Sequence, residues 1–335
     1  MKSDGSLFGL DGRMGQDISL ASCSRYNRDT FSIVGNSRIQ AMKLNLPFHL
    51  ANRNILLAGA GGGWDIAGGL PLLHEWAKTN KVVLANFSAR VEGFDVRLAT
   101  AADDPEGKVA DALGAPVYVF GKAGFRTLRT AYEKVVKEHG IDTIVLVDGG
   151  VDSLMRGDEE GCGTIFQDTI SVGVVDSLDV PTKILACVGF GTETEEGVCH
   201  YWALENIAAL TKDGGFLGAC CLTANMEAFQ YYEGVCGKVA AQTESKSHVH
   251  SRIIPAVHGE FGQHGDVFDI LSDMPPFVSP LAPIFWFFDV AAVARRNLLI
   301  SAFANTMTFA EVDNIHKEIY PSLKAKARKN RIIPL

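Results

Sequence analysis

The stretch NILLAGAGGGWDIAGG, residues 54–69, decides the fold. The run from Asn54 to Ala58 predicts a buried strand, and the glycines after it predict a tight turn into a helix that ends near Lys78. Further strands are predicted at residues 81–86, 117–120, 143–147, 183–188, 248–257 and 284–288, and further helices at 128–138, 201–211 and 309–320. Strands that alternate with helices of this length form βαβ units. We therefore predict an α/β fold with a doubly wound, largely parallel sheet and helices on both faces (Rossmann-like).

The chain outside this pattern divides into two parts. Residues 1–40 are polar and show no periodicity, which predicts an N-terminal extension. Residues 41–335 are predicted to form a single α/β domain, since 47% of the chain is hydrophobic and can bury one large core.

Composition excludes several classes of protein. The net charge of −8 would repel phosphate backbones, so we expect no nucleic-acid partner. No apolar run reaches the roughly 18 residues that span a bilayer, so we expect no membrane contact. The seven cysteines contain no CxxC pair, which favours the cytoplasm over a disulfide framework. One basic run comprises Lys324, Lys326, Arg328, Lys329 and Arg331. We predict a solvated terminal helix there, and the alternative is a nuclear-localisation signal or a patch that binds an acidic partner.

The first glycine loop is a candidate ligand site, because its backbone can approach a ligand closely. It departs from the dinucleotide fingerprint, since Trp64 occupies the third glycine position and Asn86 stands where an acid is expected. Phosphate is the leading ligand, and an acid beside the glycines favours a metal or a sugar hydroxyl as a second partner. The alternative is a turn that only packs a helix on the sheet. The predicted cofactor-binding residues here are Gly59, Gly61, Gly62, Gly63 and Asp65.

A second loop, DGGVDSLMRGDEEGCGT at residues 148–164, carries five acids among glycines. Clustered carboxylates hold a hard cation or act as acid and base groups. We predict Asp148 and Asp152 as catalytic residues, Asp148, Asp152 and Asp158 as metal ligands, and Arg156 as a phosphate-binding group. A solvated acidic loop is the alternative. It suits residues 158–160, but it suits Asp148 poorly, because a carboxylate ending a buried strand needs partners.

A third strand-end loop, residues 189–196, combines glycines, hydroxyls and acids. Gly191 and Thr192 are predicted to bind the ligand, and Glu193 is a weaker candidate. His248 and His250 are expected on one face of a strand, with His258 and His264 nearby. The favoured interpretation is polar residues on a half-exposed strand, with proton transfer or a zinc site as alternatives.

The run at residues 148–164, together with Gln167, Asp168 and Ser171, resembles the signature of the family called domain of unknown function 1152. Residues 54–69 resemble that family's opening loop, and the likeness extends over most of residues 45–320. Cys162 departs from it where an aliphatic residue is expected, which concerns packing. The family name carries no activity, so the resemblance supports the fold and the positions of the sites.

The leading functional hypothesis is an enzyme that acts on a small polar anionic ligand, such as a nucleotide, a sugar phosphate or a related acid, by transfer or hydrolysis. Mg²⁺ is the candidate cofactor, which would make it a metal-assisted transferase or hydrolase. The alternative is a non-catalytic nucleotide- or metabolite-binding protein, and a third hypothesis is a structural protein whose glycines only tighten turns. We also predict a homo-oligomer, because the extension is long for a tail and residues 275–288 are rich in aromatic bulk. For that second stretch, a buried strand with its lead-in is an equal alternative.

Overall fold

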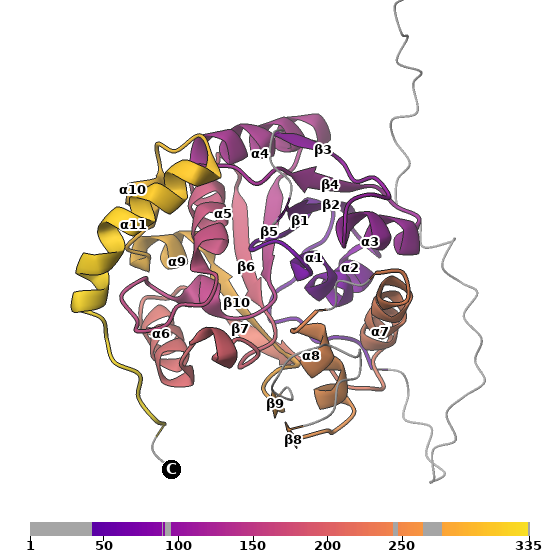
Figure 1. Ribbon diagram of the computed structural model, residues 1–335. Helices are drawn as coiled ribbons and strands as arrows, with labels where there is room; N and C mark the ends of the chain where they lie inside the picture. Colours follow the sequence, from indigo (N-terminus) through magenta and orange to yellow (C-terminus); the bar gives the residue numbers. More distant parts are fainter. Residues whose placement is uncertain (1–41, 89, 91–94, 244–246, 264–276, 334–335) are drawn as a thin grey trace, which may run out of the picture.

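The computed structural model describes residues 42–333 except residues 89, 91–94, 244–246 and 264–276 (Figure 1). The predicted N-terminal extension, residues 1–40, lies outside the described residues, so the division of the chain stays a prediction. The strands are β1 (Asn54–Gly59), β2 (Lys81–Phe87), β3 (Val96–Leu98), β4 (Val117–Phe120), β5 (Thr143–Asp148), β6 (Thr182–Cys187), β7 (Phe216–Cys221), β8 (Gly262–Gln263), β9 (Phe277–Val278) and β10 (Ile284–Asp289). The helices are α1 (Asp65–Gly68), α2 (Leu70–Trp76), α3 (Glu106–Leu113), α4 (Phe125–His139), α5 (Ile165–Ser177), α6 (His200–Lys212), α7 (Glu227–Ala240), α8 (His250–Val257), α9 (Val290–Arg296), α10 (Ile300–Phe303) and α11 (Phe309–Ala325), with 3₁₀ turns η2 (Asp152–Leu154) and η3 (Thr194–Glu196).

The main sheet has eight strands in the order β3-β4-β2-β1-β5-β6-β10-β7. Strands β4, β2, β1, β5 and β6 run parallel to their neighbours in this series, which confirms the predicted doubly wound, largely parallel sheet. Antiparallel pairs occur toward the edges, where β3 pairs with β4 and β10 pairs with both β6 and β7. The sequence pattern did not predict β3 or β7.

Alternate side chains of the central strands enter two separate cores. In β5, Ile144 and Leu146 pack on one face, and Val145 and Val147 pack on the other. All six residues of this strand are buried, as a strand covered on both faces requires. Helices α4, α5, α6, α9, α10 and α11 cover the first face, and α1, α2, α3, α7 and α8 cover the second (Figure 1).

The strand predicted at residues 248–257 is wrong, because the chain there forms helix α8. Ser247 Oγ accepts a hydrogen bond from the backbone N–H of His250, which satisfies one free donor of the first turn. Ile253 and Ile254 then point into the core one helical turn further on. The adjacent β-branched side chains suggested a strand, and the continuous burial of residues 250–255 shows no helical spacing that the sequence could have revealed.

The aromatic stretch at residues 275–288 divides at β10. Phe285, Phe287 and Phe288 are fully buried inside the sheet, so this part of the stretch is a core strand and offers no surface for an interface. Phe277, in β9, is 44% exposed and contacts Phe261.

In the described part of the chain, no helix combines the length and apolar character needed to cross a membrane.

Candidate functional site

The two predicted glycine loops lie side by side at the carboxyl edge of the sheet. Strands β1 and β5 are parallel neighbours, and the backbone N–H of Ala60 donates to the Val147 carbonyl at 2.9 Å. The Gly149 N–H then donates to Asp65 Oδ1 at 3.1 Å, which joins the second loop to the first. Strand β1 pairs with β2 on one side and with β5 on the other, so the order of the chain reverses here. Open α/β sheets bind ligands in the crevice at such a switch point.

Three buried carboxylates converge at this edge. Asp148 ends β5, Asp152 opens η2, and Asp168 lies in the first turn of α5. One oxygen from each lies within 4.8 Å of the others. Their exposed fractions are only 2%, 1% and 1% respectively. Convergent buried carboxylate oxygens are the arrangement that hard divalent cations require.

Polar neighbours hold two of these carboxylates in place. Ser153 donates to Asp148 Oδ2 through its hydroxyl and, at 3.3 Å, through its backbone N–H. Thr164 donates to Asp152 Oδ2 through its backbone N–H at 2.8 Å and its hydroxyl at 3.1 Å. Asp168 Oδ1, in contrast, is buried without a hydrogen-bond partner among the described residues. A buried carboxylate oxygen with no donor carries a large desolvation cost, which a bound cation would offset.

Two further acids enclose the three aspartates, namely Asp65 and Glu193. Half-buried Asp65 accepts hydrogen bonds from the N–H groups of Gly61, at 2.6 Å, and Gly149. Buried Glu193 accepts from the N–H groups of Val151, at 2.7 Å, and Asp152, at 3.1 Å. Glu193 therefore fixes the turn from which the Asp152 side chain projects.

Glycines give the carboxylates the space that they need. A Cβ atom on Gly61 would lie 2.6 Å from Asp168 Oδ2, and one on Gly149 would lie 2.7 Å from Asp65 Oδ1. Gly150 abuts Glu193 and Gly163 abuts Asp152 in the same way. Each contact is closer than a real Cβ allows, so these four glycines let the acids pack together.

The electrostatics of the cluster are unfavourable without a counter-ion. Burial, reinforced by the neighbouring carboxylates, raises the pKa of Asp65 and Asp148 to about 7 and that of Asp152 to about 8. The same two causes raise the pKa of Asp168 and Glu193 well above the usual range. In the part of the chain that the structure describes, no lysine, arginine or histidine forms an ion pair with any of the five.

The model of the family described as protein of unknown function (DUF1152) matches residues 94–322, more than half of the chain. The chain belongs to the DUF1152 family. The matched range contains Asp148, Asp152, Asp168 and Glu193, whereas the first glycine loop and Asp65 precede it. The chain matches no curated protein and no solved structure significantly.

The structure of this DUF1152 protein places other predicted residues away from the cluster. Asp158 pairs with Arg328, whose Nε lies 3.1 Å from Asp158 Oδ1, so Asp168 and not Asp158 completes the group of three. Arg156 also pairs with Asp158, with 3.8 Å between the guanidinium Nη2 and Oδ2. The basic run was predicted as a solvated helix, but α11 ends at Ala325 and Arg328 lies beyond it.

The remaining predicted residues occupy the loops around the cluster. Gly59 packs against the Asn86 side chain, and Gly62 and Gly63 adopt positive φ angles of 90° and 61°. Gly191 abuts His200, and the Thr192 hydroxyl donates to the Gly189 carbonyl at 2.8 Å, so these two shape the third loop.

One histidine supports the first loop and is not itself in the cluster. His250 is buried, and its Nε2 lies 3.0 Å from the Trp64 carbonyl while its Nδ1 lies 2.6 Å from the Tyr232 hydroxyl. Burial lowers its pKa to about 4, so the ring is neutral at pH 7. The carbonyl can only accept, so Nε2 donates to it and Nδ1 accepts from the tyrosine. His264 lies outside the described residues.

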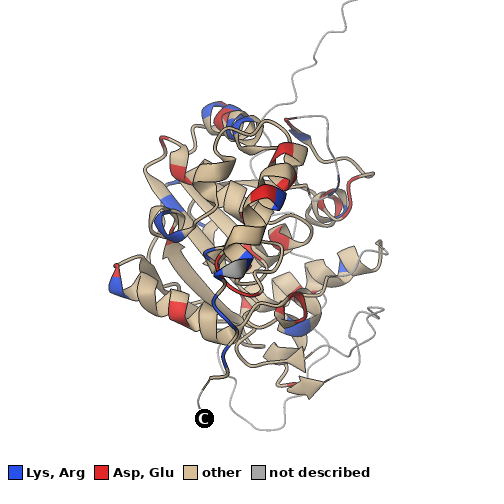
Figure 2. Ribbon diagram, turned by 60° about the vertical axis from the view of Figure 1, so that its left-hand side comes forward, with Lys and Arg blue, Asp and Glu red and all other residues tan. Residues whose placement is uncertain are grey.

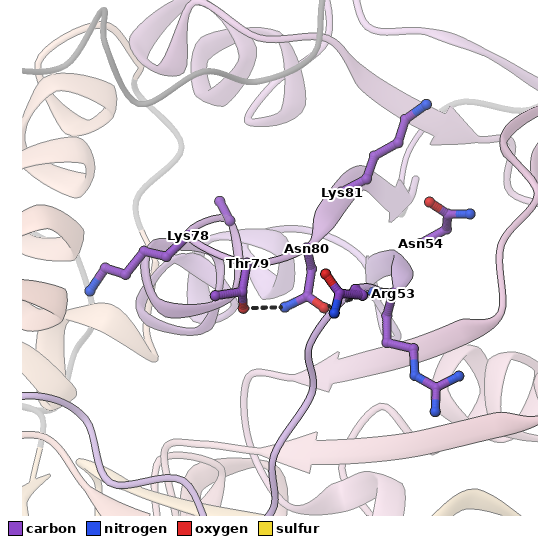
Figure 3. A pocket seen from close by; sticks show the side chains of 8 residues that line it. Arg53, Asn54, Lys78, Thr79, Asn80 and Lys81 are labelled. Atoms are coloured by element: carbon purple, nitrogen blue, oxygen red, sulfur yellow. Dashed lines mark hydrogen bonds between the residues drawn. The ribbon is translucent and has the colours of Figure 1, made fainter.

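A hollow of about 680 Å³ lies at the opposite edge of the sheet, where residues 52–54 lead into β1 and residues 77–81 lead into β2 (Figure 3). Asn80 closes this edge by accepting from the Arg53 N–H at 3.0 Å and donating to the Leu50 carbonyl at 3.0 Å. The Arg53, Lys78 and Lys81 side chains extend in different directions (Figure 3). They therefore form no convergent anion site.

Proposed function

We propose that this DUF1152 protein is a metal-assisted transferase or hydrolase whose cation is held by Asp148, Asp152 and Asp168. The observation that carries the proposal is the cluster of five enclosed carboxylates with no ion-pair partner among the described residues, one of which keeps an orphaned oxygen. Backbone and hydroxyl donors to four of the acids favour their charged forms. A cation would balance that charge, and oxygen ligands select Mg²⁺ or Mn²⁺ over softer metals.

The proposed substrate is a small anionic molecule such as a nucleotide, a sugar phosphate or a related acid. Five carboxylates would repel an anion from the glycine loops, so the cation must bind first or together with the ligand. A divalent cation would supply a Lewis acid that polarises a phosphoryl or carbonyl oxygen of the ligand, so that the attached phosphorus or carbon is more open to attack. Asp65 is the carboxylate best placed to take a proton from an attacking hydroxyl or water, because it is half-buried while the other four are buried. Gly61 to Gly63 border the space where the ligand would lie.

Calorimetry on chelator-treated protein tests the metal site. We expect Mn²⁺ to bind, and Asp168→Asn to weaken binding by at least about tenfold. The matched control is Asp179→Asn, because Asp179 is exposed in the turn after the same helix. A wild-type protein that binds neither Mg²⁺ nor Mn²⁺ at millimolar concentration would contradict the proposal.

Turnover tests the catalytic part of the proposal. A panel of nucleotides and sugar phosphates, incubated with the Mn²⁺-loaded protein, should include a compound that is hydrolysed or transferred by the wild type and not by Asp65→Asn. Binding of such a compound without turnover would favour the alternative, a non-catalytic binding protein.

We further propose a homo-oligomer in the cytoplasm, and the six described cysteines, all free thiols, are compatible with that compartment.

A further inference from the structure

The segment after α11 folds back over the acidic loop between Asp152 and Asp168. We name residues 326–331 the C-terminal strap. The Arg328 N–H donates to the Asp158 carbonyl at 2.8 Å, and the Glu160 N–H donates to the Arg328 carbonyl at 3.0 Å. Figure 2 shows basic positions along this extended segment. The strap thus pairs, as a short strand would, with residues about 170 positions earlier in the chain.

Arg328 anchors the strap by several contacts at once. Its guanidinium contacts three acids, Asp158, Glu159 and Glu205, and lies 4.3 Å from the centre of the Trp202 ring. Its side chain is only 20% exposed. A planar fork that binds several carboxylates and stacks on an aromatic ring fixes geometry in a way that a single ammonium cannot.

Glu159 connects Arg328 to the backbone of the acidic loop. Its side chain is fully buried, and besides Arg328 it accepts from the N–H groups of Arg156 and Gly157 and from the Asn206 amide. The carboxylate therefore stabilises the turn at residues 156–159 by accepting hydrogen bonds from its backbone. Removing Arg328 would leave a buried negative charge without its cation, and opening of the loop would relieve that cost.

The same loop carries the groups that hold Asp152. Thr164, which donates twice to Asp152, follows the anchored turn by a few residues. Between them, Gly161 lies tightly against Gly197, at the end of the loop that supplies Glu193. Both supports of Asp152 are thus connected to the anchored segment.

We propose that Arg328 is a positioning residue that holds the acidic loop in its metal-binding conformation. The inference rests on the proposed function, because it assigns the strap a role in the affinity of that site. Arg328 contacts none of the five clustered acids. Its effect must therefore pass through Glu159 and the loop.

Calorimetric titration of the full chain with Mn²⁺ tests this inference. We expect Arg328→Gln to weaken Mn²⁺ binding about tenfold, and Arg328→Lys to weaken it less, since the ammonium keeps the charge without the fork. Lys329→Gln is the control, because Lys329 is 78% exposed and pairs with the exposed Glu160. Its affinity should equal that of the wild type. Equal affinity for Arg328→Gln and the wild type would overturn the inference.

Hydrogen exchange separates positioning from general destabilisation. In Arg328→Gln, faster exchange should be confined to residues 149–164, while the central strands keep wild-type protection. If this variant does not fold, the milder Arg328→Lys provides the same comparison. If the wild type binds no Mn²⁺, the proposed function fails. Hydrogen exchange then remains as the test of whether the strap holds the acidic loop in place. Unchanged exchange at residues 149–164 would overturn its role.

Discussion

At the scale of the residue, we expect Asp168 to lower the stability of the metal-free protein more than any other acid of the cluster. Its side chain is buried, and one of its oxygens accepts no hydrogen bond from the described residues. Asp168→Asn removes one ionisable carboxyl group from the cluster and changes little in shape. We expect this variant, freed of metal, to be more stable than the wild type at pH 8 by on the order of 1–3 kcal/mol, because less repulsion is buried. Urea unfolding at pH 8 with a chelator measures the difference. Lower stability of the variant under these conditions would show that Asp168 has a favourable partner.

Asp148 should matter more for metal binding than Glu160, the exposed acid of the run at residues 158–160. Asp148→Asn replaces a 2%-exposed carboxylate that ends a core strand. Glu160→Gln changes an exposed side chain that pairs with Lys329. We expect the first substitution to weaken Mn²⁺ binding at least about tenfold and the second to change it by less than about twofold. Small and equal effects in calorimetric titrations would count against Asp148 as a ligand.

The residues of the candidate cluster differ in how readily the sequence predicts them. Asp148 and Asp152 follow a continuous β-branched strand, and a strand end is where ligand groups are expected. Asp158 has the same composition around it, but a guanidinium 170 residues further on pairs with it, and no local pattern encodes that contact. Asp168 lies in a helix after the acidic run, so only the fold brings it back to β5. Its place in the family-like signature was the available signal.

At the scale of the element, the turn after β1 depends on Gly61. A methyl group there would lie 2.6 Å from Asp168 Oδ2, and the carboxylate would have to move. We expect Gly61→Ala to weaken Mn²⁺ binding at least about tenfold, since ligands displaced by a few tenths of an ångström lose their common geometry. Gly237→Ala is the matched control, because a Cβ there meets nothing within 4 Å. It lies inside α7, where alanine should stabilise the helix by about 0.5–1 kcal/mol without affecting binding. Equal metal affinity in both variants would refute the packing argument.

Most core elements follow from their sequences, and the exceptions have physical reasons. Strand β4 has the predicted bounds, and β1, β2 and β5 extend the predicted ones by a single residue at the carboxyl end. These strands are continuous, apolar and buried on both faces, so local pattern and tertiary environment agree. At α8 the two conflict, because Ile253 and Ile254 favour a strand locally but lie in a short helix that is buried continuously over residues 250–255. Edge strand β7 alternates between half-buried and exposed residues, and its glycine and cysteines weaken the strand signal.

At the scale of the whole molecule, the oligomeric state stays a prediction. Its aromatic argument no longer includes β10, whose phenylalanines are buried in this chain. The argument that remains is the polar extension, residues 1–40. We expect the full chain to have the mass of an oligomer by light scattering at micromolar concentration, and a chain lacking residues 1–40 to assemble less. A monomeric mass for the full chain would contradict this prediction.

The carboxylate cluster should also control how the stability of the whole molecule depends on pH. The pKa values of about 7 for Asp65 and Asp148 and about 8 for Asp152 lie above the ordinary aspartate value of 3.8. The folded state therefore binds more protons than the unfolded state between about pH 4 and pH 8. Their contribution to stability is complete below pH 4 and is lost as the pH rises through 7 and 8. Asp103, whose pKa the Arg97 ion pair lowers to about 2, acts in the opposite direction at more acidic pH.

We therefore expect the Tm of the chelator-treated protein to fall from pH 5 to pH 8. Mn²⁺ competes with protons for the same oxygens, so its stabilising effect should grow over that interval, and its binding at pH 7 should release protons. Differential scanning calorimetry with and without Mn²⁺ measures the first effect, and titrations in buffers of different ionisation enthalpy measure the second. Asp168→Asn should flatten both dependences, whereas Asp179→Asn should reproduce the wild type. A metal-free Tm that rises steadily from pH 5 to pH 8 would mean that the five acids are already neutralised by a partner within the protein, and the proposed metal centre would then lose its physical basis.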